Sequence, residues 1–171
     1  MKAVIQRVSE AFVTVDTEEV GAIGAGLVVL LAVERGDGDR EVVQMARKIA
    51  GLRIFSDARG RMHHAVGEIG GKILAISQFT LAANLEKGFR PSFDPAEEPS
   101  RARHLFDAFC QRLRAEGLEV ATGRFGADMR VHLINDGPVT FTLTFTAPNL
   151  HDGGKTPLPP DCGTPKARAP R

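Results

Sequence analysis

The chain has 171 residues, of which 43% are hydrophobic and 25% are charged, and this fits one globular domain with a sizeable core. No apolar run approaches the ~18 residues of a membrane helix, and the N-terminus lacks the apolar stretch of a signal peptide, so we expect a cytoplasmic protein. Two cysteines, Cys110 and Cys162, are too few for a disulfide framework. A net charge of +1 gives no general argument for nucleic-acid binding.

The first third of the chain contains two strand patterns and one helix pattern. Residues 2–16 predict a strand with a kink or turn near Ser9 and Glu10, and the unbroken apolar run 24–33 predicts a buried strand. A loop follows, with Asp39 as the expected N-cap of a helix that ends at Gly51.

The same sequence signals predict the remaining helices and strands. Residues 70–81 predict a second buried strand, 82–99 a long polar loop, and 100–116 a helix with one apolar stripe that stops at Gly117. Short strands are expected at 52–57, 118–125, 129–135 and 139–145.

This arrangement favours an α+β fold. Strands outnumber helices and do not alternate regularly with them, so we predict a mostly antiparallel sheet or open β-barrel with two main helices. The folded domain should span residues 1–146. Residues 147–171 hold six of the ten prolines and few large apolar residues, which predicts a disordered tail.

The stretch NDGPVTFTLTF, residues 135–145, combines turn and strand signals. Asn135, Asp136 and Gly137 are typical of a hairpin turn, and alternating apolar residues then predict a strand. Pro138 is unusual there because it lacks the N–H that a strand ladder needs.

The stretch SQFTL places Ser77, Gln78 and Thr80 at the end of a buried strand, where polar groups can line a pocket or bond to nearby backbone. A nucleophilic hydroxyl there would need a base, and none of the five histidines lies in a known catalytic signature. Metal motifs such as H-E-x-x-H or C-x-x-C are absent from the sequence. Lys87 and Arg90 stand beside two phenylalanines, a combination that can hold phosphate and base.

Five motifs, taken in order, resemble the D-aminoacyl-tRNA deacylases: MKAVIQRV, GGKILAISQFTL, KGFRPSF, TGRFGADM and NDGPVT. The similarity spans residues 1–146. It implies a homodimeric, cytosolic α+β enzyme that needs no metal or cofactor. The implied reaction is hydrolysis of the ester that joins a D-amino acid, or glycine mischarged on alanine tRNA, to the tRNA 3′ end.

The resemblance also assigns roles to residues. It implies a pocket floor of Ser77, Gln78, Phe79 and Thr80, and a tRNA-end site with Phe125, Met129, Lys87 and Arg90. Gly137–Pro138 matches a Gly-cisPro motif that enters the active site of the other subunit and rejects L-amino acids, and Arg7 matches its anchor. After SQFTL the family often has Tyr-Ala-Asp-Thr, where this chain has Ala82 to Leu85, and Phe89 stands where Asn is common.

Three functions remain open at this point, and the first, deacylation of aminoacyl-tRNA, has two possible mechanisms. The ester is labile and the terminal ribose carries a 2′-hydroxyl, so positioning and backbone donors could suffice, and we favour this over an acyl-enzyme on Thr80. A small-ester hydrolase would instead use Thr80 or Ser77. A third possibility is a non-catalytic nucleic-acid-binding module on the same fold.

Overall fold

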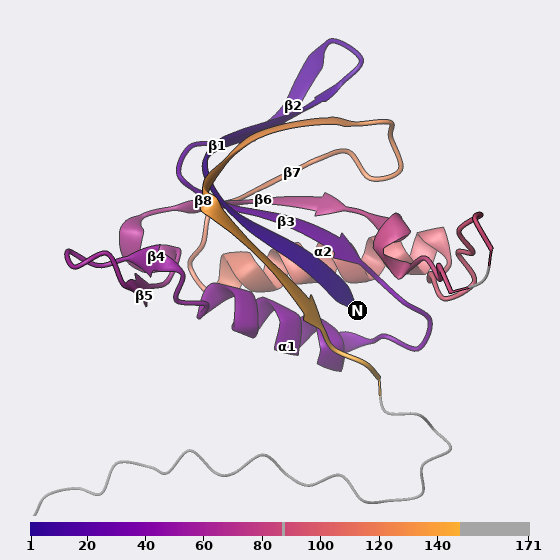
Figure 1. Ribbon diagram of the computed structural model, residues 1–171. Helices are drawn as coiled ribbons and strands as arrows, with labels where there is room; N and C mark the ends of the chain where they lie inside the picture. The colour runs from indigo at the N-terminus through magenta and orange to yellow at the C-terminus, as the bar shows by residue number, and fades with distance from the viewer. Residues whose placement is uncertain (87, 148–171) are drawn as a thin grey trace, which may run out of the picture.

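The computed structural model describes residues 1–86 and 88–147. Two helices, eight strands and two short 3₁₀ helices lie in these ranges (Figure 1). The α-helices are α1 (Asp39–Ala50) and α2 (Pro99–Ala115), and the 3₁₀ helices are η1 (Gly67–Ile69) and η2 (Phe79–Ala82). The strands are β1 (Lys2–Val15), β2 (Glu18–Ile23), β3 (Gly26–Ala32), β4 (Phe55–Ser56), β5 (Met62–His64), β6 (Lys72–Ser77), β7 (Val120–Thr122) and β8 (Arg130–Thr144).

The main sheet has six strands in the order β2-β1-β3-β6-β7, with β8 on β1. β1 pairs antiparallel with β2, β3 and β8, whereas β3–β6 and β6–β7 are parallel. The α+β class is thus confirmed, but the expected mostly antiparallel sheet is wrong, because the sheet is mixed. The reason is that α1 lies on the connection from β3 to β6 and α2 on that from β6 to β7, and such crossovers produce parallel pairs.

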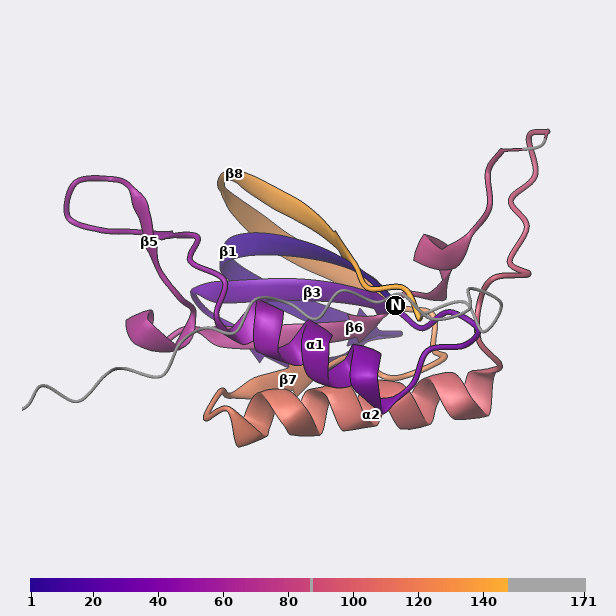
Figure 2. The ribbon, with the colours of Figure 1, turned by 90° about the horizontal axis from the view of Figure 1, so that it is seen from below.

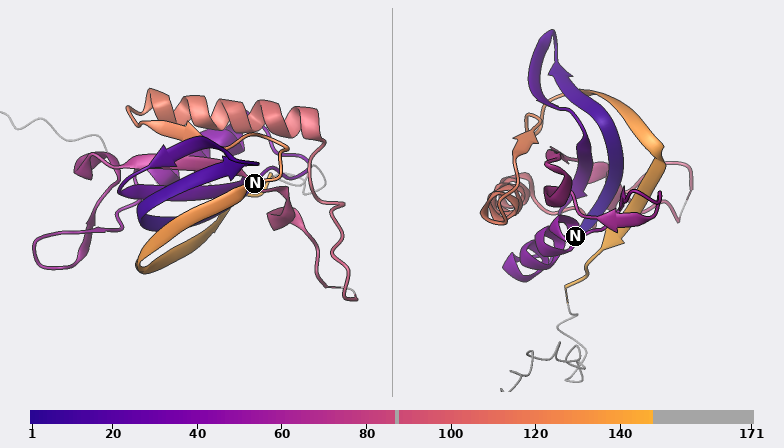
Figure 3. Two further views of the ribbon diagram at one scale, coloured as in Figure 1. Left: turned by 90° about the horizontal axis from the view of Figure 1, so that it is seen from above. Right: turned by 90° about the vertical axis from the view of Figure 1, so that its left-hand side faces the viewer.

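β1 organises the sheet because it changes partners along its length. Residues 2–8 pair with β3 and residues 11–15 pair with β2 on one edge, while β8 runs along the other edge. The predicted kink at Ser9 and Glu10 falls where the strand passes from one partner to the next. β2 curls round towards β7, and a Cβ at Gly21 would lie 2.5 Å from the backbone oxygen of Thr122. The sheet therefore forms a nearly closed barrel (Figure 3).

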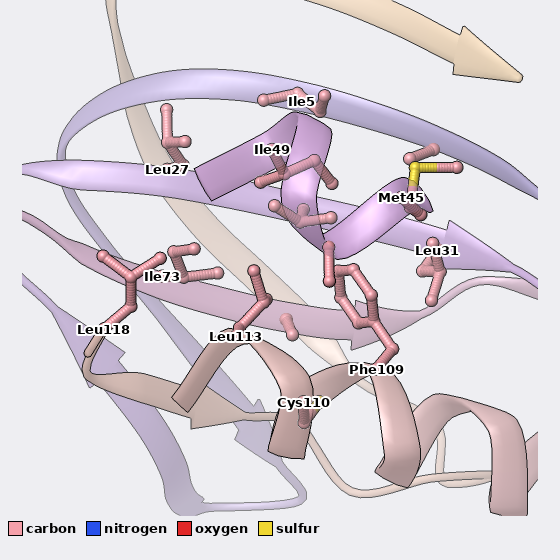
Figure 4. Close-up of a cluster of buried hydrophobic side chains, with 14 of the residues drawn as sticks. Ile5, Leu27, Leu31, Met45, Ile49, Ile73, Phe109, Cys110, Leu113 and Leu118 are labelled. Atoms are coloured by element: carbon pink, nitrogen blue, oxygen red, sulfur yellow. The ribbon is translucent and has the colours of Figure 1, made fainter. Parts of the chain in front are cut away.

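Two apolar clusters hold this arrangement together. The larger lies between the sheet and the two helices, which both cover the same face of the sheet (Figure 2). Met45 and Ile49 of α1 and Phe109 and Leu113 of α2 point into it (Figure 4). Cys110 lies in the same cluster, as expected of a core thiol, and burial raises its pKa to about 12. The second cluster fills the barrel interior, with Val8, Val13, Val28, Leu74 and Ile76 among its members.

Three local predictions are corrected by the structure. Gly38 rather than Asp39 is the N-cap of α1, and its N–H donates to Glu41 Oε2 at 2.9 Å. The predicted strand 70–81 ends at Ser77, because the chain then turns into η2. The stops at Gly51 and Gly117 agree with the observed helix ends.

The third correction concerns residues 135–137, which do not form a hairpin turn. β8 stays paired to β1 on both sides of them, through Val8–Asn135 and Gln6–Thr140. Between these pairs β1 has one residue, Arg7, whereas β8 has four, residues 136–139, so β8 forms a large bulge. The two strands predicted at 129–135 and 139–145 are therefore one strand.

The side chain of Asn135 closes the base of this bulge. Its Oδ1 accepts from the N–H of Val139 at 2.6 Å, and its Nδ2 donates to the carbonyl of Val139 and to Thr140 Oγ1. The amide thus satisfies backbone groups that the bulge removes from the ladder. Asp136, Gly137 and Pro138 remain exposed at its tip.

No helix within residues 1–86 and 88–147 is long and apolar enough to cross a membrane. The predicted disordered tail, apart from Ala147, lies outside the described residues, and the boundary at residue 146 stays a prediction.

Candidate active site

A cavity of about 440 Å³ opens at the carboxyl end of β6. Ser77, Gln78 and Phe79 line it, whereas Thr80 does not. Phe125 and Met129, from the loop between β7 and β8, also line it. The structure therefore brings together two motifs that lie about 50 residues apart in the chain.

Thr80 lies next to this cavity on η2, and its side chain is exposed. Its Oγ1 accepts a hydrogen bond from Gln78 Nε2, which orients the two side chains relative to each other. No histidine lines the cavity among the described residues. His132 instead stacks on Phe12 with ring centroids 4.4 Å apart, on β8 and β1. Among the described residues, therefore, no histidine lines the cavity to act as the base that an acyl-enzyme mechanism on Thr80 would need.

The charged groups that line the cavity are both acidic. The two residues are Glu97 and Asp128, and the sequence analysis identified neither of them as a site residue. Glu97 forms an ion pair with Arg101 at 3.3 Å, so part of its charge is compensated. A cavity of this composition suits neutral or cationic groups better than phosphate. Only the length of the predicted loop 82–99 pointed to Glu97, because long loops are often functional.

Arg7 is buried on β1 and fixes the bulge of β8. Its Nε donates to the carbonyl of Asp136 at 3.0 Å and lies 3.1 Å from Asp136 Oδ2. Its Nη1 donates to the carbonyl of Ile54, just before β4, at 2.6 Å. Gly137 has φ +143°, and a Cβ there would lie 2.6 Å from Val139 Cγ2. The Gly137–Pro138 peptide bond is cis. Arg7 therefore contacts the segment that it was expected to anchor.

Within one folded chain, Gly137 and Pro138 lie near the level at which β6 begins, whereas the cavity lies where β6 ends. Arg7 pairs with Leu27, and Leu27 pairs with Ile73 near the start of β6. Ser77 at the end of β6 lies four residues further along, roughly 13 Å at 3.3 Å per residue. Gly137 and Pro138 do not line the cavity of their own chain.

Of the two cations predicted for the tRNA-end site, only Arg90 can be compared with the cavity. Lys87 lies outside the described residues, and Arg90 is exposed on the loop between η2 and α2 without lining the cavity. Phe125 lies close to Phe106, and Arg103 lies 6.0 Å from the Phe125 ring centroid. In residues 1–86 and 88–147, no group of three or more His, Cys, Asp or Glu side chains could hold a metal ion.

The sequence of this chain is similar to those of known proteins. Residues 4–144 match the family model described as D-Tyr-tRNA(Tyr) deacylase. The chain belongs to this family. It is 59% identical over 143 residues to a D-aminoacyl-tRNA deacylase of Geobacter sulfurreducens, covering 84% of this chain and 94% of the relative. A D-aminoacyl-tRNA deacylase of Magnetococcus marinus is 58% identical, covering 84% of this chain and 95% of the relative.

Two solved structures share the fold of this chain. A structure titled c-Myc DNA Unwinding Element Binding Protein has a TM-score of 0.81 and 42% identity, and covers 86% of this chain and 100% of that one. A probable eukaryotic D-amino acid tRNA deacylase has a TM-score of 0.73 at 17% identity, and covers 83% and 97%, which shows the fold alone.

We predict that Arg7→Lys lowers the free energy of unfolding by about 2–4 kcal/mol, because an ammonium cannot reproduce the contacts of the guanidinium to Asp136 and Ile54. Denaturant unfolding measures this change. The matched control is Arg35→Lys, since Arg35 is exposed and donates to Ala96 at 3.3 Å, and we expect a change within about 0.5 kcal/mol. Equal effects of the two substitutions would contradict the anchoring role.

Proposed function

We propose that the chain hydrolyses the ester bond of D-aminoacyl-tRNA, and of glycine mischarged on alanine tRNA, and releases the free tRNA and amino acid. Membership of the deacylase family supports the hydrolase class. The observation that carries the proposal is the joining of SQFTL and FGADM residues around one cavity, within the span that matches the family.

The cavity suits the end of the tRNA rather than its phosphates. About 440 Å³ is within the usual range for a small-molecule site, which accommodates a nucleoside with an attached amino acid. Phe125 and Met129 offer apolar contacts for the adenine. Glu97 and Asp128 favour the free ammonium group of the aminoacyl ester.

Catalysis in this proposal rests on positioning and on the 2′-hydroxyl of the terminal ribose. The hydroxyl activates the attacking water, so no strong protein base is required. The N–H groups that open η2, those of Phe79 and Thr80, donate to the developing oxyanion. Gln78 and Thr80 then serve mainly to fix this turn, through their hydrogen bond.

A second copy of the chain completes the site. The bulge of β8 exposes Gly137 and Pro138 far from their own cavity, so they can enter the cavity of a partner. Exposed apolar side chains on β8, among them Val131, Ile134 and Phe141, give a surface for such a homodimer. Backbone atoms of Gly137 and Pro138 then pack against the substrate Cα, where an L side chain would clash. Esters of D-amino acids and of glycine have no side chain in that position, so they bind and are hydrolysed.

One alternative has its own support. The structural relative titled c-Myc DNA Unwinding Element Binding Protein is 42% identical, which supports a nucleic-acid-binding role. A deacylation assay separates it from the enzyme. A small-ester hydrolase using Thr80 is disfavoured by the exposed Thr80 hydroxyl, which accepts from Gln78 rather than donating to a histidine. A location in the cytoplasm stays a prediction.

We predict that Thr80→Val reduces deacylation of D-aminoacyl-tRNA by less than about tenfold, whereas a substrate with a 2′-deoxy terminal adenosine loses about 10²–10⁴-fold. Single-turnover hydrolysis of both substrates by both proteins measures this. Complete loss of deacylation in folded Thr80→Val, together with full activity of the unsubstituted protein on the 2′-deoxy substrate, would establish Thr80 as the nucleophile instead.

We also predict that Gly137→Ala lowers the D-over-L rate ratio by about 100-fold, because the Cβ clash with Val139 displaces the backbone and a displacement of about 1 Å costs about 10²-fold. Gly24→Ala is the matched control, since a Cβ at Gly24 meets nothing within 4 Å. Unchanged selectivity in a folded Gly137→Ala protein would contradict the gate.

A further inference from the structure

The loop from residue 83 to residue 98, between η2 and α2, exposes aromatic side chains to solvent. Phe89 is fully exposed, Phe93 is 38% exposed, and Phe79 of the preceding η2 is 56% exposed. A folded chain normally buries such rings, which contribute much to core and interface energetics. Exposed rings grouped on one loop therefore indicate a surface that contacts something else.

The structure holds these rings in place. Asn84 and Ser92 exchange two backbone hydrogen bonds of 2.8 and 3.0 Å, so the two arms of the loop are paired. Below this pair, Phe93 packs on Phe79 with ring centroids 5.0 Å apart. Beyond this pair, the tip of the loop projects away from the sheet (Figure 2).

The aromatic pair is continuous with the cavity. Phe79 lines the cavity and also contacts Phe93, so Phe93 lies directly outside the cavity wall. Anything that extends out of the cavity on this side meets Phe79 and Phe93 first and the loop tip next.

The charge of the loop limits what can bind to it. Residues 83–98 contain the acids Glu86, Asp94, Glu97 and Glu98 and only the bases Lys87 and Arg90. An excess of acid does not attract the phosphates of a nucleic acid. Flat aromatic faces still bind unpaired bases by stacking, which does not depend on charge or sequence.

We propose that Phe79, Phe93 and Phe89 form a stacking surface for the unpaired bases that precede the terminal nucleotide of the tRNA. This inference rests on the proposed function and adds a second binding region to it. The terminal nucleoside occupies the cavity, the preceding base stacks on the Phe79–Phe93 pair, and Phe89 covers the next base. A second copy of the chain is a poorer occupant, because interface cores are depleted of charged residues and this loop is rich in acids.

The test compares two substrates that differ in length. Phe89→Ala should reduce kcat/KM on D-aminoacyl-tRNA by roughly 5- to 150-fold, through KM, and leave hydrolysis of D-aminoacyl-adenosine unchanged. Phe89→Tyr keeps the ring and should restore most of the loss, whereas Phe89→Leu should not. Met62→Ala removes another exposed apolar side chain, 51% exposed on β5, and should have no effect.

A second readout separates stacking from charge and from catalysis. Binding of an uncharged oligonucleotide that ends in CCA should weaken in Phe89→Ala by the same factor at low and at high salt. Equal losses on both substrates, no loss on the tRNA, a changed salt dependence, or a shift from dimer to monomer in sedimentation would each overturn the inference. An inactive wild-type protein would instead contradict the proposed function, and the oligonucleotide binding would still test the stacking surface.

Discussion

The contacts of the buried Arg7 guanidinium hold the bulge of β8, on which the proposed chiral selection depends. The guanidinium joins β1, the backbone before β4 and the bulge of β8 at one point, through Ile54 and Asp136. The bulge places four residues of β8 opposite a single residue of β1, so most of the strand-to-strand hydrogen bonds that would fix it are absent. The side chains of Arg7 and Asn135 replace them, and the backbone of Gly137 and Pro138 is held in a defined exposed position.

This placement separates two parts that the proposed reaction needs together. The cavity forms where β6 ends and η2 begins, whereas the bulge lies beside the start of β6. A single chain thus has an open cavity with acidic and aromatic walls at one end, and a fixed backbone projection at the other. In the proposed reaction a second copy joins them, so the proposed selection against L-amino acids and the proposed dimer are tested together.

The sequence predicted the α+β class, both helix stops and the core position of Cys110, because each depends on local periodicity or a single glycine. It misread Asn135 to Gly137 as a turn, since turn residues and a bulge use the same local chemistry and only pairing with β1 distinguishes them. The parallel strand pairs and the cavity residues Glu97 and Asp128 depend on long-range packing that no short motif encodes. The roles of Ser77 and Gly137 came from the family resemblance alone.

A mixing experiment tests the central claim, that each site combines two chains. Ala127→Trp fills the cavity, and Gly137→Ala damages the bulge. The D-over-L deacylation ratio is measured for each variant alone and after the two are unfolded and refolded together. If sites are shared, random pairing leaves about a quarter of all sites with an intact cavity and an intact bulge and another quarter with an intact cavity and a damaged bulge, so the D-over-L ratio rises to about twice that of the Gly137→Ala protein alone. A mixture that shows only the ratio of the Gly137→Ala protein would contradict the account.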